Sequence, residues 1–215
     1  MCTSTRLIVI LLAALCLLAT KARADSLLSV GGTGDRGHAI DDDEAAAASF
    51  TLANTYYEVA IRAELSAFAS SEAIAFLMTN IGAGAGFSDV KAYVDLSGSD
   101  ISTEPTLLFD GLTLSAGDYF LVVSTVSGFL YWEGSSTPIV TAAPGVVHGV
   151  DFFTDDAETF PPFSRFDVLF DRAAHFTIHG TSSAPVPEPA SLTLFAVGFL
   201  GFVSRLSGKR VRRAS

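Results

Sequence analysis

Two groups of carboxylates are the residues best suited to chemistry in this sequence. One is the run Asp41-Asp42-Asp43-Glu44, and the other comprises Asp151, Asp155, Asp156 and Glu158. Carboxylate oxygens are the ligands that Ca²⁺ prefers in proteins. The first run lacks the alternate spacing and the central glycine of an EF-hand loop, so its sequence favours a solvated acidic turn before a strand.

The second acidic group has aromatic neighbours, at Phe152 and Phe153 and in the sequence Phe160-Pro161-Pro162-Phe163. Carboxylates beside exposed aromatic rings would suit a Ca²⁺-assisted carbohydrate site. Asp151, Asp155, Asp156 and Glu158 are therefore the candidate metal ligands. The alternative is a long surface loop whose aromatic side chains pack onto the domain.

The four histidines do not form a recognisable site in the sequence. His175 and His179 would project from the same face of a strand, with Thr177 between them. A strand advances about 3.3 Å per residue, so the two rings are too far apart to hold one ion without a bend. We expect them to face solvent, and His38 and His148 have no partner nearby in the sequence.

No catalytic residue is predicted. Serines, histidines and aspartates are present, but no Gly-x-Ser-x-Gly elbow and no His-Glu-x-x-His motif organises them. The sequence Gly31-Gly32-Thr33-Gly34 lacks the Lys-Ser/Thr of a phosphate-binding loop. The prediction is a protein that is not an enzyme and has no cofactor, with Ca²⁺ as the one ion that the acidic groups suggest.

Short strands must position these residues. Residues 57–62 alternate between apolar and polar side chains, as a half-buried strand does, and residues 73–78 fit a buried strand, with a short helix as the alternative. Residues 82–86 form a glycine-rich loop, and residues 90–96 are ambiguous. Strands are also expected at residues 50–53 and 128–132, with hairpins at residues 112–123, around Gly117, and at residues 166–179.

This pattern predicts an all-β domain, an antiparallel β-sandwich or jelly roll. Most of the seventeen phenylalanines would lie in its core. Residues 25–183 are long enough to bury one ordinary core. We therefore expect a single exported domain over that range.

Charge is divided along the chain. The formal net charge is −10, and between residues 25 and 187 the basic residues are only Arg36, Arg62, Lys91, Arg165 and Arg172. An acidic surface repels phosphate backbones, which argues against nucleic-acid binding. Acidity is compatible with solubility, with divalent cations and with polysaccharide, and solubility alone is the favoured explanation.

The N-terminus has the layout of a secretory signal peptide. Arg6 precedes an apolar stretch at residues 7–19, and Ala22-Arg23-Ala24 offers a small-x-small cleavage site. We expect a signal peptide at residues 1–24. Both cysteines, Cys2 and Cys16, lie inside it, so the mature chain would contain neither a disulfide nor a thiol ligand.

The last thirty residues combine three features. The motif Val186-Pro187-Glu188-Pro189-Ala190-Ser191 precedes an apolar run at residues 192–203, and a basic tail follows with Arg205, Lys209, Arg210, Arg212 and Arg213. The prolines bar a helix before the apolar run. A membrane segment at about residues 190–204 is short for a bilayer, and the positive-inside rule places the tail in the cytoplasm.

This ending resembles the PEP-CTERM sorting signals, which combine a Val-Pro-Glu-Pro-like motif, a membrane segment and an arginine-rich end. The resemblance implies processing by a membrane-embedded exosortase in a Gram-negative bacterium. An ordinary stop-transfer anchor with a proline-rich stalk is the alternative. Residues 50–53, 75–82 and 111–121 are also similar to β-rich domains common among proteins with such signals.

Three function classes follow. The first is an exported, non-catalytic structural or interaction protein, held in the inner membrane as a precursor and then placed at the cell surface or in the extracellular matrix. Its expected partners are an exosortase, the membrane and exopolysaccharide, but not nucleic acid. The second is a Ca²⁺-assisted carbohydrate-binding module, and the third, a hydrolase, is least favoured.

Overall fold

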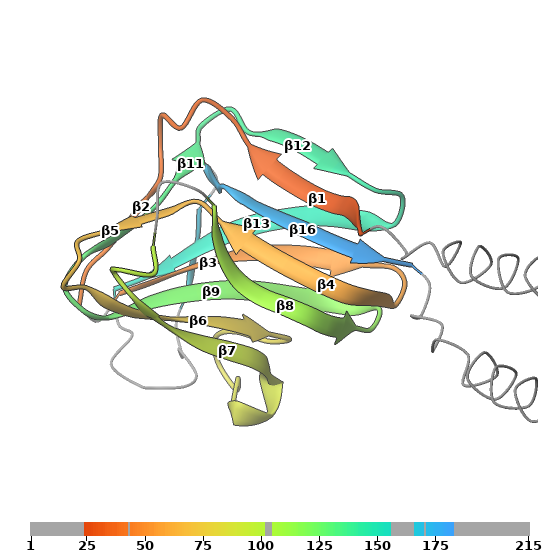
Figure 1. Cartoon of the computed structure of the whole chain (residues 1–215), viewed down its shortest axis with the longest axis horizontal. Helices are drawn as coiled ribbons and strands as arrows, with labels where there is room; N and C mark the ends of the chain where they lie inside the picture. Colours follow the sequence, from red (N-terminus) through yellow and green to blue (C-terminus); the bar gives the residue numbers. More distant parts are fainter. Residues whose placement is uncertain (1–23, 43, 102–104, 156–165, 170, 183–215) are drawn as a thin grey trace, which may run out of the picture. The chain divides into compact units, whose positions relative to one another are not determined.

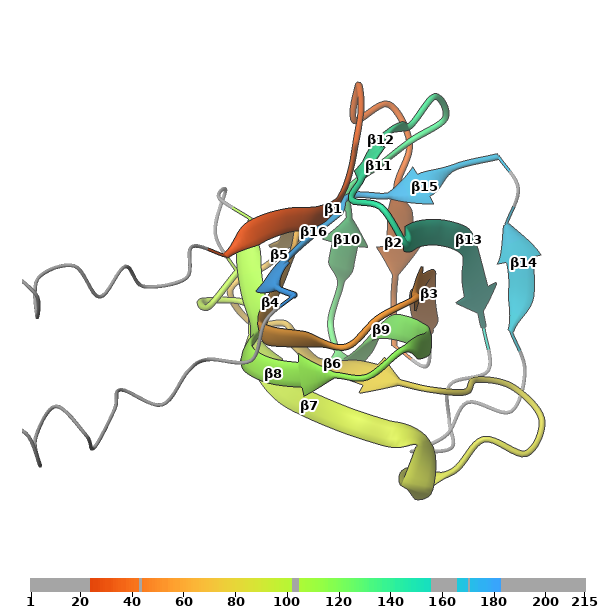
Figure 2. The same cartoon turned by 90° about the vertical axis from the view of Figure 1, so that its right-hand side faces the viewer.

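The described part of the chain is built from two large antiparallel sheets, seen one above the other in Figure 1 and from the side in Figure 2. The computed structural model describes residues 24–42, 44–101, 105–155, 166–169 and 171–182. All of these residues belong to one compact unit.

One large sheet has five strands in the order β12-β1-β16-β4-β8, and the other has six in the order β14-β13-β3-β9-β6-β7. The five-stranded sheet comprises β12 (Ile139–Ala142), β1 (Asp25–Gly31), β16 (Phe176–Thr181), β4 (Tyr56–Ala63) and β8 (Thr106–Leu114). The six-stranded sheet comprises β14 (Asp167–Leu169), β13 (Val146–Thr154), β3 (Ala45–Leu52), β9 (Gly117–Ser127), β6 (Glu72–Met78) and β7 (Val90–Ser97).

Two small sheets complete the described structure. One contains β2 (His38–Ile40), β10 (Leu130–Trp132) and β5 (Leu65–Ala67), and the other pairs β11 (Gly134–Ser135) with β15 (Ala173–Ala174). In Figure 1, β2 and β5 lie at the left end of the large sheets. The helical part of the described residues is a single 3₁₀ turn, η1 (Phe87–Asp89). The prediction of an all-β, antiparallel domain is confirmed.

The core lies between the large sheets and draws side chains from both. Phe50 of β3 and Phe176 of β16 meet with ring centroids 6.2 Å apart, and Phe50 also stacks on Tyr119 of β9 at 5.5 Å. Burial of such apolar area is the main favourable term in folding. Four of the described phenylalanines are buried, namely Phe50, Phe76, Phe109 and Phe176, whereas Phe68 and Phe87 are exposed. Phe120, Phe152, Phe153 and Phe166 are partly buried and pack against the core, so most of the described phenylalanines lie in it or against it.

The expected alternation in β4 is present with one interruption. Val59, Ile61 and Ala63 are buried while Arg62 is exposed, as a half-buried strand requires. Glu58 has a positive φ of 50°, and the pairing with β8 shifts register beside it. This bulge explains why Tyr56, rather than the predicted Tyr57, is buried.

Both predicted hairpins are wrong. The segments on either side of residues 115 and 116 are strands, but β8 pairs with β4 and β9 pairs with β3 and β6, so the connection crosses between the two large sheets. Likewise β14 pairs with β13, and β16 pairs with β1 and β4. Hydrophobic alternation locates strands but does not specify their partners.

Candidate functional site

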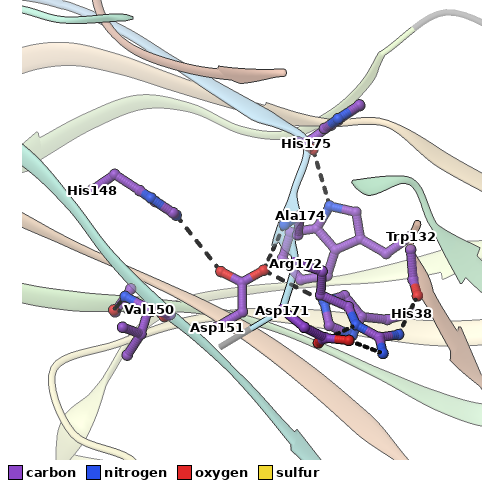
Figure 3. Close-up of polar contacts among 11 residues, drawn as sticks. His38, Trp132, His148, Val150, Asp151, Asp171, Arg172, Ala174 and His175 are labelled. Atoms are coloured by element: carbon purple, nitrogen blue, oxygen red, sulfur yellow. Dashed lines mark hydrogen bonds and ion pairs between the residues drawn. The ribbon is translucent and has the colours of Figure 1, made fainter. Parts of the chain in front are cut away.

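The densest group of titratable side chains surrounds the buried carboxylate of Asp151 in β13 (Figure 3). His38 comes from β2, His148 from β13 itself, and Ala174 from β15. Side-chain exposure is 0% for Asp151, 2% for His38 and 11% for His148. We call these four residues the Asp151 cluster.

A bulge in β13 brings His148 and Asp151 to the same side of the strand. Residues three apart on a regular strand face opposite ways, but here His148 pairs with Phe50 and Asp151 with Ala48, and the register shifts between them. Phe50 and Ala48 both face the core. The extra residue of the bulge therefore turns both polar side chains inward.

Ser49 and Gly149 build this bulge. The Ser49 hydroxyl donates to the Val150 carbonyl at 2.8 Å, and the Val150 N–H donates to the same hydroxyl at 2.9 Å. A Cβ on Gly149 would lie 2.2 Å from the Ser49 Oγ. Glycine at position 149 thus leaves the space in which the serine satisfies both backbone groups that the bulge removes from the ladder.

Protein groups surround the Asp151 carboxylate. Oδ2 accepts a hydrogen bond from the Ala174 N–H and lies 3.4 Å from His38 Nε2, and Oδ1 lies 3.6 Å from His148 Nε2. Burial is the largest single influence on the Asp151 pKa and raises it, but the contacts with His148, His38 and Ala174 together outweigh burial and hold that pKa below its ordinary value. Asp151 is therefore a buried carboxylate whose Oδ2 is hydrogen-bonded from β15 and β2, while His148 of β13 lies beside Oδ1 beyond hydrogen-bond distance.

A second layer of contacts holds the cluster in place. The His38 ring meets Trp132 edge-on, with centroids 6.5 Å apart, and the Trp132 Nε1–H donates to the His175 carbonyl at 3.0 Å. His175 Nδ1 lies 2.9 Å from Glu64 Oε2. The cluster is thus continuous with the buried end of the core, where Trp132 is fully enclosed.

Arg172 lies beside the cluster, in the chain segment before β15 (Figure 3). Its guanidinium donates to the Gly37 carbonyl at 3.0 Å and to both oxygens of Asp171, which also pairs with Arg36 at 3.1 Å. The hydrogen bonds from Arg172 lower the pKa of Asp171. These contacts tie the segment before β2 to the segment before β15.

The sequence analysis did not predict this cluster, and its prediction that His175 faces solvent is wrong. His175 is not solvent-facing but buried, with 3% exposure, whereas His179 is half-buried. His38 and His148 meet the same carboxylate although 113 residues separate His38 from Asp151. Gly149, inside a strand with alternating neighbours, was the one local signal of a bulge.

The four predicted metal ligands are not seen together in one site, since the structure describes only two of them. Asp151 is enclosed in its cluster, Asp155 is exposed just after β13, and Asp156 and Glu158 lie outside the described residues. Within the described part of the chain, no group of three or more His, Cys, Asp or Glu side chains is placed to hold a metal ion. The four-residue metal site stays a prediction.

The first acidic run forms a tight turn where it is described. The Asp41 N–H donates to Glu44 Oε2 at 2.7 Å, and the Glu44 N–H donates to the Asp41 carbonyl at 3.1 Å. Asp41 and Asp42 are exposed, and Asp43 lies outside the described residues. The Glu44 carboxylate thus caps its own turn.

A pocket of about 560 Å³ lies apart from the Asp151 cluster. It is lined by residues 112–119 with Thr79 and Lys91. The Tyr119 hydroxyl on its wall donates to the Ser115 carbonyl at 2.8 Å. No member of the Asp151 cluster lines this pocket. A substrate bound in the pocket would therefore not contact Asp151, His38 or His148.

A family model matches the chain after its last described strand. The model is that of the PEP-CTERM protein-sorting motif, and it covers residues 185–210. This chain carries a PEP-CTERM sorting motif. The match includes Val186, Pro187, Glu188, Pro189, Ala190 and Ser191 and the tail residues Arg205, Lys209 and Arg210, while Arg212 and Arg213 lie beyond it. The comparison with curated proteins finds no match.

The PEP-CTERM motif indicates an exported protein that an exosortase sorts and that is anchored in the membrane before processing. The matched residues lie outside those that the structure describes, as do the predicted signal peptide and the predicted membrane segment at residues 190–204. In the described part of the chain, no helix is long and apolar enough to cross a membrane.

Proposed function

We propose that the β-sandwich domain at residues 25–183 is the cargo of the PEP-CTERM signal and has a non-catalytic, structural or interaction role. It would act at the cell surface or in the extracellular matrix of a Gram-negative bacterium, without a cofactor. The observation that carries this proposal is the sorting match at residues 185–210, directly after β16 ends at Thr181.

The Asp151 cluster supports a structural role. A general acid or base must come within hydrogen-bond reach of a substrate, whereas the Asp151 carboxylate is 0% exposed and lies among groups from β2, β13 and β15. Its environment favours a permanent charge that joins three strands. A hydrolase would instead place its acid and base beside a pocket.

The calcium-assisted carbohydrate hypothesis has less support. Asp151 is enclosed by protein donors, so a calcium site there would have to displace the contacts with His38 and Ala174. Such a site would then depend on Asp155, Asp156 and Glu158. We therefore propose the structural role first.

The sorting half of the proposal is tested by the mature C-terminus. The full chain is expressed with and without an exosortase, and the mass of the product is measured. We expect loss of the basic tail only with the exosortase, and full-length product from the Pro187→Ala/Pro189→Ala double variant. Pro144→Ala, in an exposed turn of the domain, is the matched control and should be processed normally. Normal processing of the double variant would contradict the sorting role.

The cargo half is tested by location. The processed protein should be recovered with the cell surface or the matrix. It should not hydrolyse glycan or ester substrates, and Asp151→Asn should change only its stability. Hydrolysis that depends on His38 or His148 would refute the non-catalytic assignment.

A further inference from the structure

One sheet edge of the domain differs from the other three. Among the described residues, the edges of the two large sheets are β12, β8, β14 and β7. Unpaired edges are templates for pairing with another chain, and proteins usually protect them with charges, bulges or short length. Strand β7 carries exposed Lys91 and Asp95, and β14, which is about as short as β12, begins with exposed Asp167. Strand β8 carries exposed Asp110 and pairs through three register shifts.

Strand β12, at the upper edge of Figure 1, has neither charge nor bulge. All four of its residues are exposed, with Ile139 at 70% and Val140 at 43%. Residues 134–150 contain no Asp, Glu, Lys or Arg in a chain of net charge −10. On the neighbouring β13, Val147 is also 59% exposed. This region is therefore an apolar, uncharged edge on an acidic domain.

The backbone groups on the free side of β12 can be assigned. Leu28 pairs with Ala142 and Val30 with Val140, and the Ala143 N–H donates to the Leu27 carbonyl at 2.8 Å. Hydrogen-bonded and non-bonded pairs alternate along an antiparallel ladder. Because position 143 bonds to β1, the N–H and C=O groups of Val140 and Ala142 point toward the free edge, where no described residue pairs with them.

Prolines limit this edge at both ends. Pro138 lies two residues before Val140, and Pro144 lies two residues after Ala142, so both prolines also face the free edge. Proline has no N–H to donate there. The open edge is therefore the pair Val140 and Ala142 alone. A partner strand shifted by two residues would meet a proline and lose hydrogen bonds, so the edge accepts one register.

We propose that β12 pairs with β12 of a second copy of this chain, antiparallel about a two-fold axis at Thr141. In that register Val140 of each copy opposes Ala142 of the other, and each of these pairs exchanges two hydrogen bonds. The contact is self-complementary, as a two-fold interface must be. Two acidic domains repel each other elsewhere, and the uncharged edge is where they can approach without opposing like charges.

The expected contact is small, well below the roughly 1,200 Å² of a stable interface. It therefore suits copies that are already concentrated on a surface, where a raised effective concentration favours weak contacts. The PEP-CTERM signal supplies that condition, because it implies membrane anchoring before processing. The inference rests on the proposed export route in one respect, namely that the copies meet at the membrane. The pairing of the two β12 strands is argued from the domain alone.

Site-specific disulfide formation tests the register. In this pairing Thr141 lies opposite the same residue of the second copy in a non-hydrogen-bonded pair, with Cα atoms about 4.5 Å apart. That distance is inside the range of about 4.4–6.8 Å that disulfides span. The full chain carrying Thr141→Cys is expressed without exosortase, so that the anchored precursor is retained, and membranes are treated with a mild oxidant. We expect a covalent species of twice the chain mass, linked through position 141.

Two matched variants separate edge pairing from chance collision. Tyr93→Cys places a thiol on the exposed but charged edge β7, and only a trace of dimer is expected from it. Ala142→Pro in the Thr141→Cys chain removes an edge-facing N–H that β1 does not use, so the domain should fold and the dimer should be lost, whereas Ala142→Ser should keep it.

Three results with these variants would each overturn the proposal, and a fourth concerns the mass of the adduct. The three are absence of dimer from Thr141→Cys, equal dimer from Tyr93→Cys, and dimer unaffected by Ala142→Pro in a chain that still resists protease. An adduct whose mass is not twice that of the chain would also overturn it, because the edge would then serve another protein. The C-terminal mass measured with exosortase reports separately on sorting.

Discussion

Removing the charge of Asp151 should destabilise the domain strongly. Its Oδ2 accepts the Ala174 N–H and faces His38, and its Oδ1 faces His148. Asp151→Ala would leave the buried Ala174 amide without an acceptor and both histidine rings without the carboxylate beside them. Leaving a buried polar group without its partner costs about 1–3 kcal/mol, and more than one group loses its partner here, so we expect a loss of about 3 kcal/mol. A loss of 3 kcal/mol lowers the melting temperature of a domain of this length by roughly 10 °C.

Asp151→Asn removes the negative charge of the side chain but keeps its shape. An asparagine oxygen can still accept a hydrogen bond from the Ala174 N–H. Hydrogen bonds to charged groups contribute about 1.5–3 kcal/mol and neutral ones about 0.5–1.5 kcal/mol, so we expect this variant to lose about 1–2 kcal/mol. Asp155→Asn is the matched control, because Asp155 is exposed and surface substitutions usually change stability by less than about 0.5 kcal/mol. Urea denaturation of residues 25–183, followed by circular dichroism, measures all three variants.

The pH dependence gives a second readout. The pKa of Asp151 is lowered in the folded state, so its contribution to stability is fully present above the unfolded pKa of about 3.9 and is lost as the pH falls toward the folded value. Wild type should therefore lose more stability than Asp151→Asn on acidification below about pH 4. If Asp151→Asn matched wild type at pH 7 and followed the same acid profile, Asp151 would not be the buried anion described here.

Further substitutions test the supports of the cluster, each by urea denaturation. Gly149→Ala should displace the Ser49 hydroxyl from Val150 and cost about 1–3 kcal/mol. Gly86→Ala, where the nearest atom would be 3.8 Å away, should cost less than 1 kcal/mol, and equal losses would contradict the role of the bulge. Trp132→Phe removes the buried donor to the His175 carbonyl, so a loss of at least about 1–3 kcal/mol is expected. A loss below 0.5 kcal/mol would show that this hydrogen bond contributes little.

The sequence predicted the strands better than their partners. Strands β4 and β6 were predicted correctly from the alternation at Val59 and Ile61 and from the apolar run at residues 73–78. Burial of one or both faces of a strand determines which local positions are apolar, so the sequence shows it directly. The partners of β8 and β9 could not be read, because a turn residue such as Gly117 is compatible both with a hairpin and with a crossing between sheets. That choice depends on how the whole core packs.

The Asp151 cluster was harder to predict from the sequence than the strand partners. Its members come from β2, β13 and β15, and their proximity depends on a bulge that changes which way Asp151 faces. Without that bulge, alternation places His148 and Asp151 on opposite faces of β13. The sorting motif was predictable for the opposite reason, since it is a contiguous stretch that needs no tertiary context.

Polar cross-links in this domain do part of what disulfides do in other exported domains. Residues 25–183 contain no cysteine, yet Asp35 accepts hydrogen bonds from Thr33, Ser135 and Ser136 and so joins segments about 100 residues apart. These donors, Ser136 foremost, hold the Asp35 pKa far below its ordinary value. The Asp35 carboxylate is exposed to solvent, which screens such contacts, whereas Asp151 is enclosed. Asp151 should therefore contribute more to the stability of the fold, and Asp35 should mainly fix the loop between β1 and β2. If Asp35→Asn proved as destabilising as Asp151→Asn, burial would not be what separates the two carboxylates.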